Sequence, residues 1–424
     1  MKITVLGMGY IGLPTAIMFA NHNQDVLGVD VNPQVVEMLQ NGQVHIEEPG
    51  LQEALNQAVE QENFRVGLTP KPADVFIVAV PTPNNDDALK SCNLDYVLSA
   101  VEMILPCLRS GNTIIVESTI APRSMEDFIK PLVEKAGFTI GKDVFLVHCP
   151  ERVLPGQVIH ELVYNNRIIG GVTPACTEAG KQVYGVFVKG ELIEAKASVA
   201  EMAKLMENTY RDVNIALANE LVKVCDKIEI NALEVIEKAN KHPRVNLHHP
   251  GPGVGGHCLA VDPYFIASKA EEESPLIQTA REINTSMPEF VIGKVNDLMA
   301  DKIHPKIVVM GLTYKGDIDD ARESPAVLIY QMLEQNDAYD VVVYEPHIQA
   351  DFIEKDLSKA LDKADLVLVL TDHSEFKTLS ANDFSKTNNA IVIDTKNVLD
   401  LCKNDKNYFN LGSIFELKHH LVRF

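Results

Sequence analysis

A single cysteine lies in a glycine- and proline-rich stretch, Pro250–Tyr264, which reads PGPGVGGHCLAVDPY. Glycine and proline disfavour both helix and central strand, so the sequence predicts an accessible loop that carries Cys258. Asp262 follows four residues later and precedes Pro263, which favours an extended or turn conformation at Asp262. A thiolate on such a loop can act as a nucleophile, and a neighbouring carboxylate can transfer protons. The alternative interpretation is a thiol on a tight turn without a chemical role.

A second pair of polar residues lies on a predicted long helix. Ser198 and Glu201 form an S-x-x-E capping box, and the helical pattern that follows runs to about Asp226. Lys204 and Asn208 are four residues apart and therefore share one face of this helix. The alternative is a solvated polar stripe, but Asn is a poor interior helix residue unless its amide has a partner. The broad apolar surface of the helix predicts a contact between two copies of the chain.

The start of the chain has the pattern of a dinucleotide site. A short apolar strand, Lys2–Leu6, leads into G-x-G-x-x-G and a helical pattern, and the next strand, Val26–Val29, ends at Asp30. Glycines there allow a pyrophosphate to approach the backbone at a helix N-terminus. Asp30 would accept hydrogen bonds from an adenosine ribose and repel a 2′-phosphate, so NAD is expected rather than NADP. The predicted cofactor contacts in the motif are Gly7, Gly9, Tyr10, Ile11 and Gly12.

Polar residues also follow the next predicted strands. Because the carboxyl ends of parallel strands meet at one edge, we expect Pro81, Thr82 and Thr119 to flank the nicotinamide half of the cofactor. Helix capping is the alternative role for these hydroxyls. The strand Val144–Val147 leads to Glu151, which is a candidate active-site carboxylate unless it is simply an exposed loop acid.

The strand and glycine-loop pattern recurs from Pro305 onward. A strand, the glycine loop Gly311–Gly316, a helix and a strand that ends at Glu345 predict a second doubly wound domain. This repeat lacks a complete G-x-G-x-x-G, so a second NAD is not expected, whereas Lys315 and Arg322 supply cations suited to phosphates. The expected fold is therefore α/β, with two Rossmann-like domains (1–190 and 301–424) joined by a helical domain (191–300).

Composition limits the class of protein. A chain of 424 residues can form two or three domains, and its net charge of −21 argues against nucleic acid or an anionic membrane as partners. The start, MKITVLGMG, has no signal-peptide pattern, and the chain contains no apolar run long enough to span a bilayer. Seven scattered cysteines, an odd number, predict reduced thiols in a cytoplasmic protein.

Taken together, these motifs resemble the nucleotide-sugar 6-dehydrogenase family, typified by UDP-glucose dehydrogenases, over essentially the whole chain. Besides the motifs above, the resemblance is carried by Glu48-Pro49-Gly50-Leu51, Gly255-Gly256-His257-Cys258 and Tyr314-Lys315-Gly316-Asp317. The stretch Cys149–Gly156 departs from the N-P-E-F-L-x-E-G pattern of UDP-glucose dehydrogenases and is similar to the branch that acts on UDP-N-acetylmannosamine. Pro155 stands where that pattern has its second glutamate.

The resemblance implies a four-electron oxidation of a sugar C6 alcohol to a carboxylate with two NAD+, for surface or capsular polysaccharide precursors. Cys258 would form a thiohemiacetal and then a thioester, the glycines beside it leaving space for the hexose. Lys204 and Asn208 would stabilise oxyanions, Asp262 would transfer protons, and Glu151 with a water on Thr119 would promote hydrolysis. Arg322 is expected at the cofactor pyrophosphate. The residues expected near the substrate are Glu151, Arg152, Lys204, Asn208, Arg244 (from a neighbouring subunit), Gly255, Lys315 and Lys396.

Alternative functions remain to be weighed. His248, His249, His257 and Cys258 suggest a metal site, but adjacent side chains diverge and no Cys-x2-Cys pattern accompanies them, so no metal is expected. A two-electron hydroxyacid dehydrogenase would lack the second doubly wound domain, and a non-catalytic nucleotide-sugar sensor would not need Cys258.

One further hypothesis concerns Cys92, in the loop Asn84–Asn93 at the same predicted sheet edge. A disulfide between Cys92 and Cys258 would switch activity off under oxidation, unless Cys92 is an unrelated surface thiol.

Overall fold

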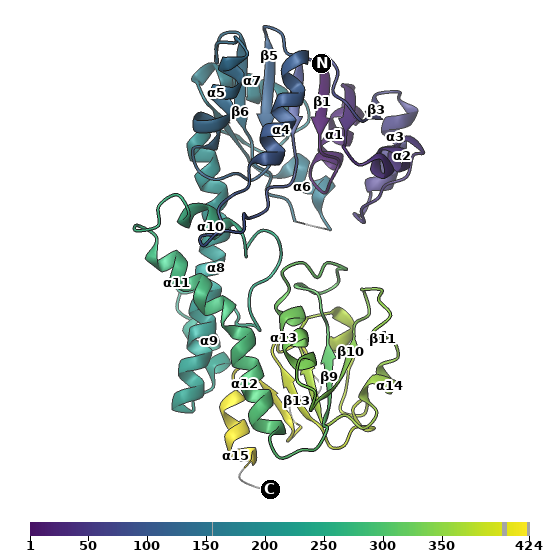
Figure 1. Ribbon diagram of the computed structural model, residues 1–424, viewed down its shortest axis with the longest axis vertical. Coiled ribbons are helices and arrows are strands. Elements are labelled where there is room, and N and C mark those ends of the chain that lie inside the picture. The colour runs from purple at the N-terminus through teal and green to yellow at the C-terminus, as the bar shows by residue number, and fades with distance from the viewer. Residues whose placement is uncertain (155, 401–404, 422–424) are drawn as a thin grey trace. The chain divides into compact units, whose positions relative to one another are not determined.

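The chain folds into two compact α/β units in a computed structural model that describes residues 1–154, 156–400 and 405–421. The first unit comprises residues 1–207 and 264–271, and the second comprises 208–263 and 272–424. Each unit contains one sheet with helices packed against it (Figure 1). The two predicted Rossmann-like folds are therefore confirmed, whereas the three-domain division at 190 and 300 stays a prediction. Pro155 lies outside the described residues.

An eight-stranded sheet organises the first unit, in the order β3-β2-β1-β4-β5-β6-β7-β8 among the described residues. All neighbours pair in parallel except β6 and β7, which are antiparallel. The chain order reverses between β1 and β4, which is where doubly wound sheets bind ligands at their carboxyl edge. The strands are β1 (Lys2–Leu6), β2 (Asp25–Val29), β3 (Phe64–Gly67), β4 (Val75–Val78), β5 (Asn112–Val116), β6 (Val144–His148), β7 (Arg167–Gly171) and β8 (Leu192–Lys196).

The helices of the first unit pack apolar faces on this sheet. Strands β4 and β5 are buried throughout, as expected for strands covered on both faces. Helix α1 is buried almost along its whole length, because its apolar residues surround it on nearly every side. The helices are α1 (Gly12–Asn21), α2 (Pro33–Gln40), α3 (Leu51–Glu60), α4 (Asp95–Ile104), α5 (Lys130–Lys135, preceded by a π-helical turn, Met125–Ile129), α6 (Val158–Tyr164) and α7 (Pro174–Tyr184).

A six-stranded sheet, all parallel, forms the core of the second unit in the order β11-β10-β9-β12-β13-β14. Its chain order reverses between β9 and β12, in the same way as in the first unit. The elements are β9 (Lys306–Met310), α13 (Pro325–Glu334), β10 (Asp340–Tyr344), β11 (Ile353–Glu354), α14 (Leu357–Leu361), β12 (Leu366–Val369), β13 (Ile391–Asp394), β14 (Tyr408–Asn410) and α15 (Leu417–Leu421).

The long helix α8 (Ala197–Ile228) has 32 residues, about 48 Å of helix, and passes from the first unit into the second. The predicted capping box is wrong. Ser198 lies inside the helix, and the Glu201 carboxylate instead accepts hydrogen bonds from the backbone N–H groups of Arg123 (2.5 Å) and Met125 (2.8 Å). A tertiary partner has replaced the local one.

The second half of α8 packs beside α11 (Pro275–Thr285) and α12 (Met287–Met299), with α9 (Ala232–Ala239) after its end (Figure 1). The buried Asp212 carboxylate lies 2.5 Å from the Arg281 guanidinium, and the Asn219 amide donates to the Asn284 amide oxygen at 2.9 Å. Buried polar groups need such partners, and these fix α8 against α11. In the described ranges, no helix combines the length and apolar character that crossing a bilayer requires.

Candidate functional site

The glycine loop between β1 and α1 has the geometry of a dinucleotide site. Gly7 has φ +92°, a left-handed conformation, and a Cβ on Gly12 would lie 1.9 Å from the Gly7 carbonyl oxygen. A Cβ on Gly9, in contrast, would meet nothing within 4 Å, so open space faces the backbone where a pyrophosphate would approach. Asp30 directly follows β2 and accepts hydrogen bonds from the N–H groups of Met8 (2.9 Å) and Asn32 (2.8 Å). The residues present therefore fit NAD.

The ends of β4 and β5 lie side by side at this carboxyl edge, as the sequence predicts. The Ser118 hydroxyl donates to the Val80 carbonyl oxygen at 2.7 Å and so ties the segment after β5 to the segment after β4. Thr82 and Thr119, each partly buried, are carried by these two segments. Their assignment to the nicotinamide stays a prediction.

Glu151 follows β6 at the same edge, and its carboxylate is nearly buried, with a 7% exposed side chain. One oxygen accepts from the backbone N–H of Arg152 at 2.8 Å, and the other is ion-paired with the guanidinium of Arg167. The Arg167 guanidinium also lies 3.3 Å from Glu117, a buried residue directly after β5. Sequence reasoning missed both Arg167 and Glu117.

Glu48, a motif residue to which sequence reasoning gave no role, holds the segment that follows Glu151. Its two carboxylate oxygens accept from the N–H groups of Gly156 and Val158, both at 2.8 Å. Since Val158 begins α6, Glu48 satisfies N–H groups at the helix start that have no partner within the helix. Nearby, the Arg152 guanidinium lies 2.7 Å from Glu207, an ion pair that occupies a residue predicted to contact substrate.

The cysteine loop places Cys258 one turn before Asp262. The Asp262 N–H donates to the Cys258 carbonyl oxygen at 2.9 Å, and Asp262 begins the short helix α10 (Asp262–Ala267). Cys258 is half-buried, whereas Asp262 is 3% exposed and accepts a 2.6 Å hydrogen bond from the Asn208 amide. Asn208 therefore has the partner that its position in a helix requires, and Lys204, 9% exposed, lies one turn before it on α8.

The structure gives the glycines of this loop a reason other than space for a sugar. A Cβ on Gly255 would lie 2.5 Å from the Glu323 carbonyl oxygen, and one on Gly256, at φ +81°, would lie 2.8 Å from the Tyr314 ring. The Gly256 N–H also donates to the Arg322 carbonyl oxygen at 3.2 Å. These glycines let the cysteine loop pack closely on the segment between β9 and α13.

The carboxyl edge of the second sheet differs from that of the first. Glu345 directly follows β10 as Asp30 follows β2, but Glu345 is fully buried and accepts from the N–H groups of Leu312 and His347, both at 2.7 Å. His373 contacts the same carboxylate at 3.1 Å. Asp30 makes the same pair of backbone contacts but is only partly buried, so Glu345 differs from it in its full burial and in its contact with His373. The expectation that this sheet holds no second NAD stays a prediction.

The predicted cations of the second unit have acidic neighbours. Lys396, after β13, lies 3.5 Å from Asp372, and the Arg322 guanidinium makes a forked contact with Asp320, with one nitrogen 3.4 Å from His257. Lys315 and Arg244 are both exposed. Their roles in binding substrate or cofactor stay predictions.

One cluster near this edge has metal-ligand chemistry. Atoms of Asp317, His347, His373 and Glu375 lie within 4.8 Å of one another. However, His373 Nδ1 accepts from the Asp317 N–H at 3.0 Å, so Nε2 carries the proton and donates to Glu345. Both ring nitrogens of His373 are therefore engaged in hydrogen bonds within the protein. We interpret the cluster as a structural hydrogen-bond network, not as a metal site.

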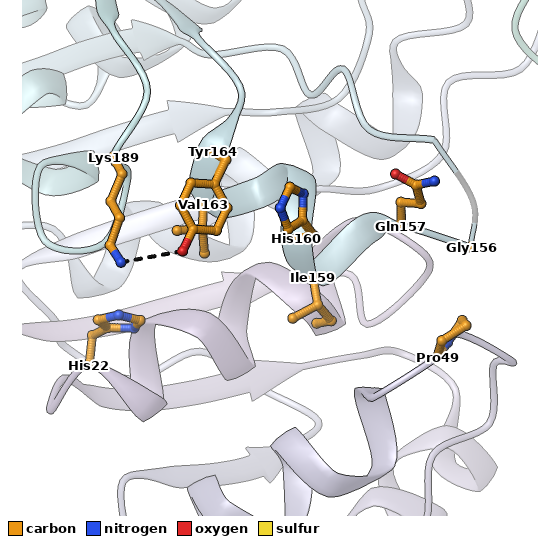
Figure 2. A pocket seen from close by; sticks show the side chains of 9 residues that line it. All are labelled: His22, Pro49, Gly156, Gln157, Ile159, His160, Val163, Tyr164 and Lys189. Carbon is orange, nitrogen blue, oxygen red and sulfur yellow. Dashed lines mark hydrogen bonds between the residues drawn. The ribbon is translucent and has the colours of Figure 1, made fainter.

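A shallow hollow of about 720 Å³ lies elsewhere in the first unit (Figure 2). The Lys189 ammonium is 3.5 Å from the Tyr164 hydroxyl, and the Tyr164 ring stacks on His160. None of the predicted site residues lines this hollow, so we place the chemistry at the sheet edges instead. Its lining is His22, Pro49, Gly156, Gln157, Ile159, His160, Val163, Tyr164 and Lys189.

A glycine loop that fits NAD, an acid after the next strand and a second doubly wound unit indicate an NAD-dependent dehydrogenase. The models of the UDP-glucose/GDP-mannose dehydrogenase family match the chain in order: the NAD binding domain over residues 1–188, the central domain over 198–286 and the UDP binding domain over 308–401. The chain belongs to this family, and it is an enzyme that oxidises UDP-sugars with NAD.

Curated relatives and solved structures agree with this assignment. The chain is 47% identical to UDP-N-acetyl-D-mannosamine dehydrogenase of Methanococcus maripaludis, over 94% of this chain and 93% of that protein. It is 44% identical to NDP-N-acetyl-D-galactosaminuronic acid dehydrogenase of Ralstonia nicotianae, over 93% and 95%. The native structure of the UDP-N-acetyl-mannosamine dehydrogenase Cap5O from Staphylococcus aureus is 59% identical, with a TM-score of 0.92 over 99% of this chain and 100% of that one.

Proposed function

We propose that the chain oxidises the C6 hydroxyl of UDP-N-acetylmannosamine to the carboxylate, for surface or capsular polysaccharide precursors. The observation that carries the chemistry is an Asp262 carboxylate held by Asn208 one helical turn after Cys258 in the same loop. Two observations support this substrate. Relatives of the chain are named UDP-N-acetyl-D-mannosamine dehydrogenases, and the stretch Cys149–Gly156 differs from the N-P-E-F-L-x-E-G pattern of UDP-glucose dehydrogenases. The scattered, odd-numbered cysteines favour action in the reducing cytoplasm.

The reaction needs a covalent step because an aldehyde has no second hydride in a suitable position until a nucleophile adds to it. The glycine loop and Asp30 would hold NAD+, which, bound twice in succession, would supply the acceptor for each of the two hydrides. The Cys258 thiolate adds to the aldehyde carbon to give a thiohemiacetal, and oxidation of that adduct leaves a thioester. Water then cleaves the carbon–sulfur bond, which releases the carboxylate and restores the thiol. Holding the intermediate also prevents loss of a reactive aldehyde.

Neighbouring side chains have separate parts in this scheme. The Lys204 ammonium and the Asn208 amide stabilise the oxyanion that forms when the nucleophile adds. Asp262 transfers protons to and from the reacting oxygen, and Glu151 with Thr119 orients the hydrolytic water. Lys315, Lys396, Arg152, Gly255 and Arg244 of a neighbouring subunit contact the nucleotide sugar, and Arg322 contacts the cofactor pyrophosphate.

Substrate choice is tested by NADH formation with UDP-N-acetylmannosamine, UDP-glucose, UDP-N-acetylglucosamine and GDP-mannose at equal concentrations. We expect kcat/KM for UDP-N-acetylmannosamine to exceed each of the others by at least about 10-fold. A site that hydrogen-bonds the N-acetyl group rejects UDP-glucose and GDP-mannose, which lack it, and UDP-N-acetylglucosamine, which carries it in the opposite orientation at C2. A preference for UDP-glucose would contradict the branch assignment. Tight binding of the sugars without NADH would indicate the sensor alternative.

We also propose that the enzyme is a homodimer through α8. Exposed apolar side chains at helical spacing form one stripe along it: Met202, Met206, Tyr210, Leu217, Val224 and Ile228. Leu217→Glu should convert the dimer to a monomer in light scattering, because a charge would be buried in an apolar contact. Val59→Glu, at an exposed apolar position on α3, is the matched control and should leave the mass unchanged. A monomeric parent protein would refute the proposal.

Cys92 gives a further proposal, a redox switch with Cys258. Cys92 is half-buried and forms an isolated β-bridge with Asn84. Peroxide would take two electrons from the two thiols to form the disulfide and water, which removes the nucleophile. Activity should fall after peroxide and return with dithiothreitol, and Cys92→Ser should retain activity without that reversible loss. An identical response in the Cys92→Ser variant would show that Cys92 has no part in the inactivation.

A further inference from the structure

We propose that Arg167 is a positioning residue that holds the Glu151 carboxylate through a buried network completed by Glu117. This inference rests on the hydrolytic role proposed above for Glu151. It concerns three charged side chains that come from three separate parts of the first unit. The network explains how an acid on a loop is kept in one place at the sheet edge.

The register of the sheet brings Glu151 and Arg167 together. β6 and β7 are antiparallel, with Val147 opposite Gly171 and His148 opposite Gly170. Continuing this register by three residues places position 151 opposite position 167. Because β7 runs against β6, its first residue lies at the carboxyl edge, where parallel strands would place their last.

Burial makes the ion pairs in this network specific. The side chains of Glu117, Arg167 and Glu151 are 0%, 4% and 7% exposed. A guanidinium buried to this extent requires a charged partner, and its planar fork can bind two carboxylates at once. Both oxygens of Glu151 are engaged, one by Arg167 and one by the Arg152 backbone, so its orientation is fixed from two sides.

Glu117 and its neighbours hold Arg167 in turn. Glu117 accepts hydrogen bonds from the hydroxyls of Tyr184 (2.6 Å) and Thr15 (3.2 Å). The Arg167 guanidinium carbon lies 4.4 Å from the centre of the Tyr184 ring, a cation–π contact, and Nη1 lies 3.8 Å from Cys149 Sγ. The arginine held by these contacts donates from Nη2 to Glu151.

Protonation of Glu117 would change how tightly Glu151 is held. Burial raises the pKa of Glu117 to about 7, which the charge of Arg167 opposes and that of Glu151 reinforces. Burial also raises the pKa of the Cys149 thiol to about 12 and raises the pKa of Tyr184, so neither titrates near neutrality. Below pH 7 Glu117 is protonated and neutral, so Glu151 is the only one of the two carboxylates that forms an ion pair with the Arg167 guanidinium. Above pH 7 both carboxylates are charged and share the guanidinium.

The kinetic test compares Arg167→Lys with Glu151→Gln in rapid mixing with NAD+ and UDP-N-acetylmannosamine. Lysine keeps the positive charge of Arg167 but lacks the planar, two-pronged guanidinium. We therefore expect the Arg167→Lys enzyme to form its first NADH as fast as the parent enzyme does. Its steady-state turnover should then be about 10- to 100-fold slower than that of the parent. Intact-protein mass should show a sugar adduct on Cys258. Adding Arg167→Lys to Glu151→Gln should cause little further loss. Arg65→Lys, at an exposed pair with Asp25, is the control and should leave turnover unchanged.

Two more measurements keep the inference falsifiable. Glu117→Gln retains the shape of the side chain, and it should remove the inflection near pH 7 from the pH profile of turnover. A crystal structure of Arg167→Lys should show the Glu151 carboxylate displaced, and this readout does not depend on activity. An undisplaced Glu151, fully multiplicative effects of the two variants or an unchanged pH profile would overturn the proposal. A parent protein that oxidises no nucleotide sugar, while Arg167→Lys still displaces Glu151, would refute the proposed function and leave the positioning role standing.

Discussion

Replacing Cys258 by Ser should abolish four-electron turnover while NAD+ affinity, measured by calorimetry, stays at the parent value. A serine hydroxyl is scarcely ionised near neutral pH, and an ester would be a poorer acyl intermediate than a thioester. We therefore expect uronate formation to fall by at least about 10³-fold, the scale on which enzymes lose rate when a nucleophile is removed. NAD+ binding should persist because the glycine loop belongs to the first sheet and Cys258 does not.

Cys107→Ser is the matched control. Cys107 is also half-buried, but it follows α4 and its thiol lies 3.8 Å from the Pro70 carbonyl oxygen, in a part of the first unit that carries no predicted site residue. Its replacement should leave turnover within about 2-fold of the parent. Uronate formation by Cys258→Ser at the rate of the Cys107→Ser control would rule out the covalent mechanism.

Replacing Lys204 by Met should lower kcat by about 10²- to 10⁴-fold, the range typical of a lost oxyanion or proton-transfer group, with little change in KM. Methionine fills a similar volume and is a good helix former, so α8 should remain intact. In a Lys204→Ala variant, whose shortened side chain leaves space for an amine, ethylamine added to the solution should restore part of the rate, which a purely structural defect would not allow. The measurement is the initial rate of NADH formation with and without the amine.

Lys227→Met is the control for this variant. Lys227 is exposed in the last turn of the same helix, so the same substitution there tests the effect of losing a lysine from α8. Turnover should be unchanged. A Lys204→Met enzyme with kcat near the parent value would mean that Lys204 is only a buried structural lysine.

Much of the fold could be predicted because local sequence and tertiary structure agree. The strand at Lys2–Leu6 was predicted with its observed bounds, and the glycine loop and Asp30 follow where a βαβ unit requires them. The prediction of a capping box was wrong because it assumed that Glu201 binds a backbone N–H group at the start of its own helix. That carboxylate binds the backbone of Arg123 and Met125, which are 78 and 76 residues away in sequence, and no local pattern encodes such a partner.

Parts of the candidate site could be predicted where the local sequence alone indicates what a side chain must contact. Asn208 was singled out because an interior helix Asn needs a partner, and the structure supplies Asp262. Arg167 was missed because its position depends on one antiparallel pairing in an otherwise parallel sheet. An arginine at the start of an apolar strand is the only local signal, and it does not reveal which acids that arginine meets.

The central claim, a four-electron oxidation through Cys258, is tested most directly by its stoichiometry. A limiting amount of UDP-N-acetylmannosamine is consumed with excess NAD+, and NADH and uronate are both quantified. We expect two NADH for each uronate formed, with no aldehyde released. One NADH for each sugar, with a free aldehyde as product, would contradict it.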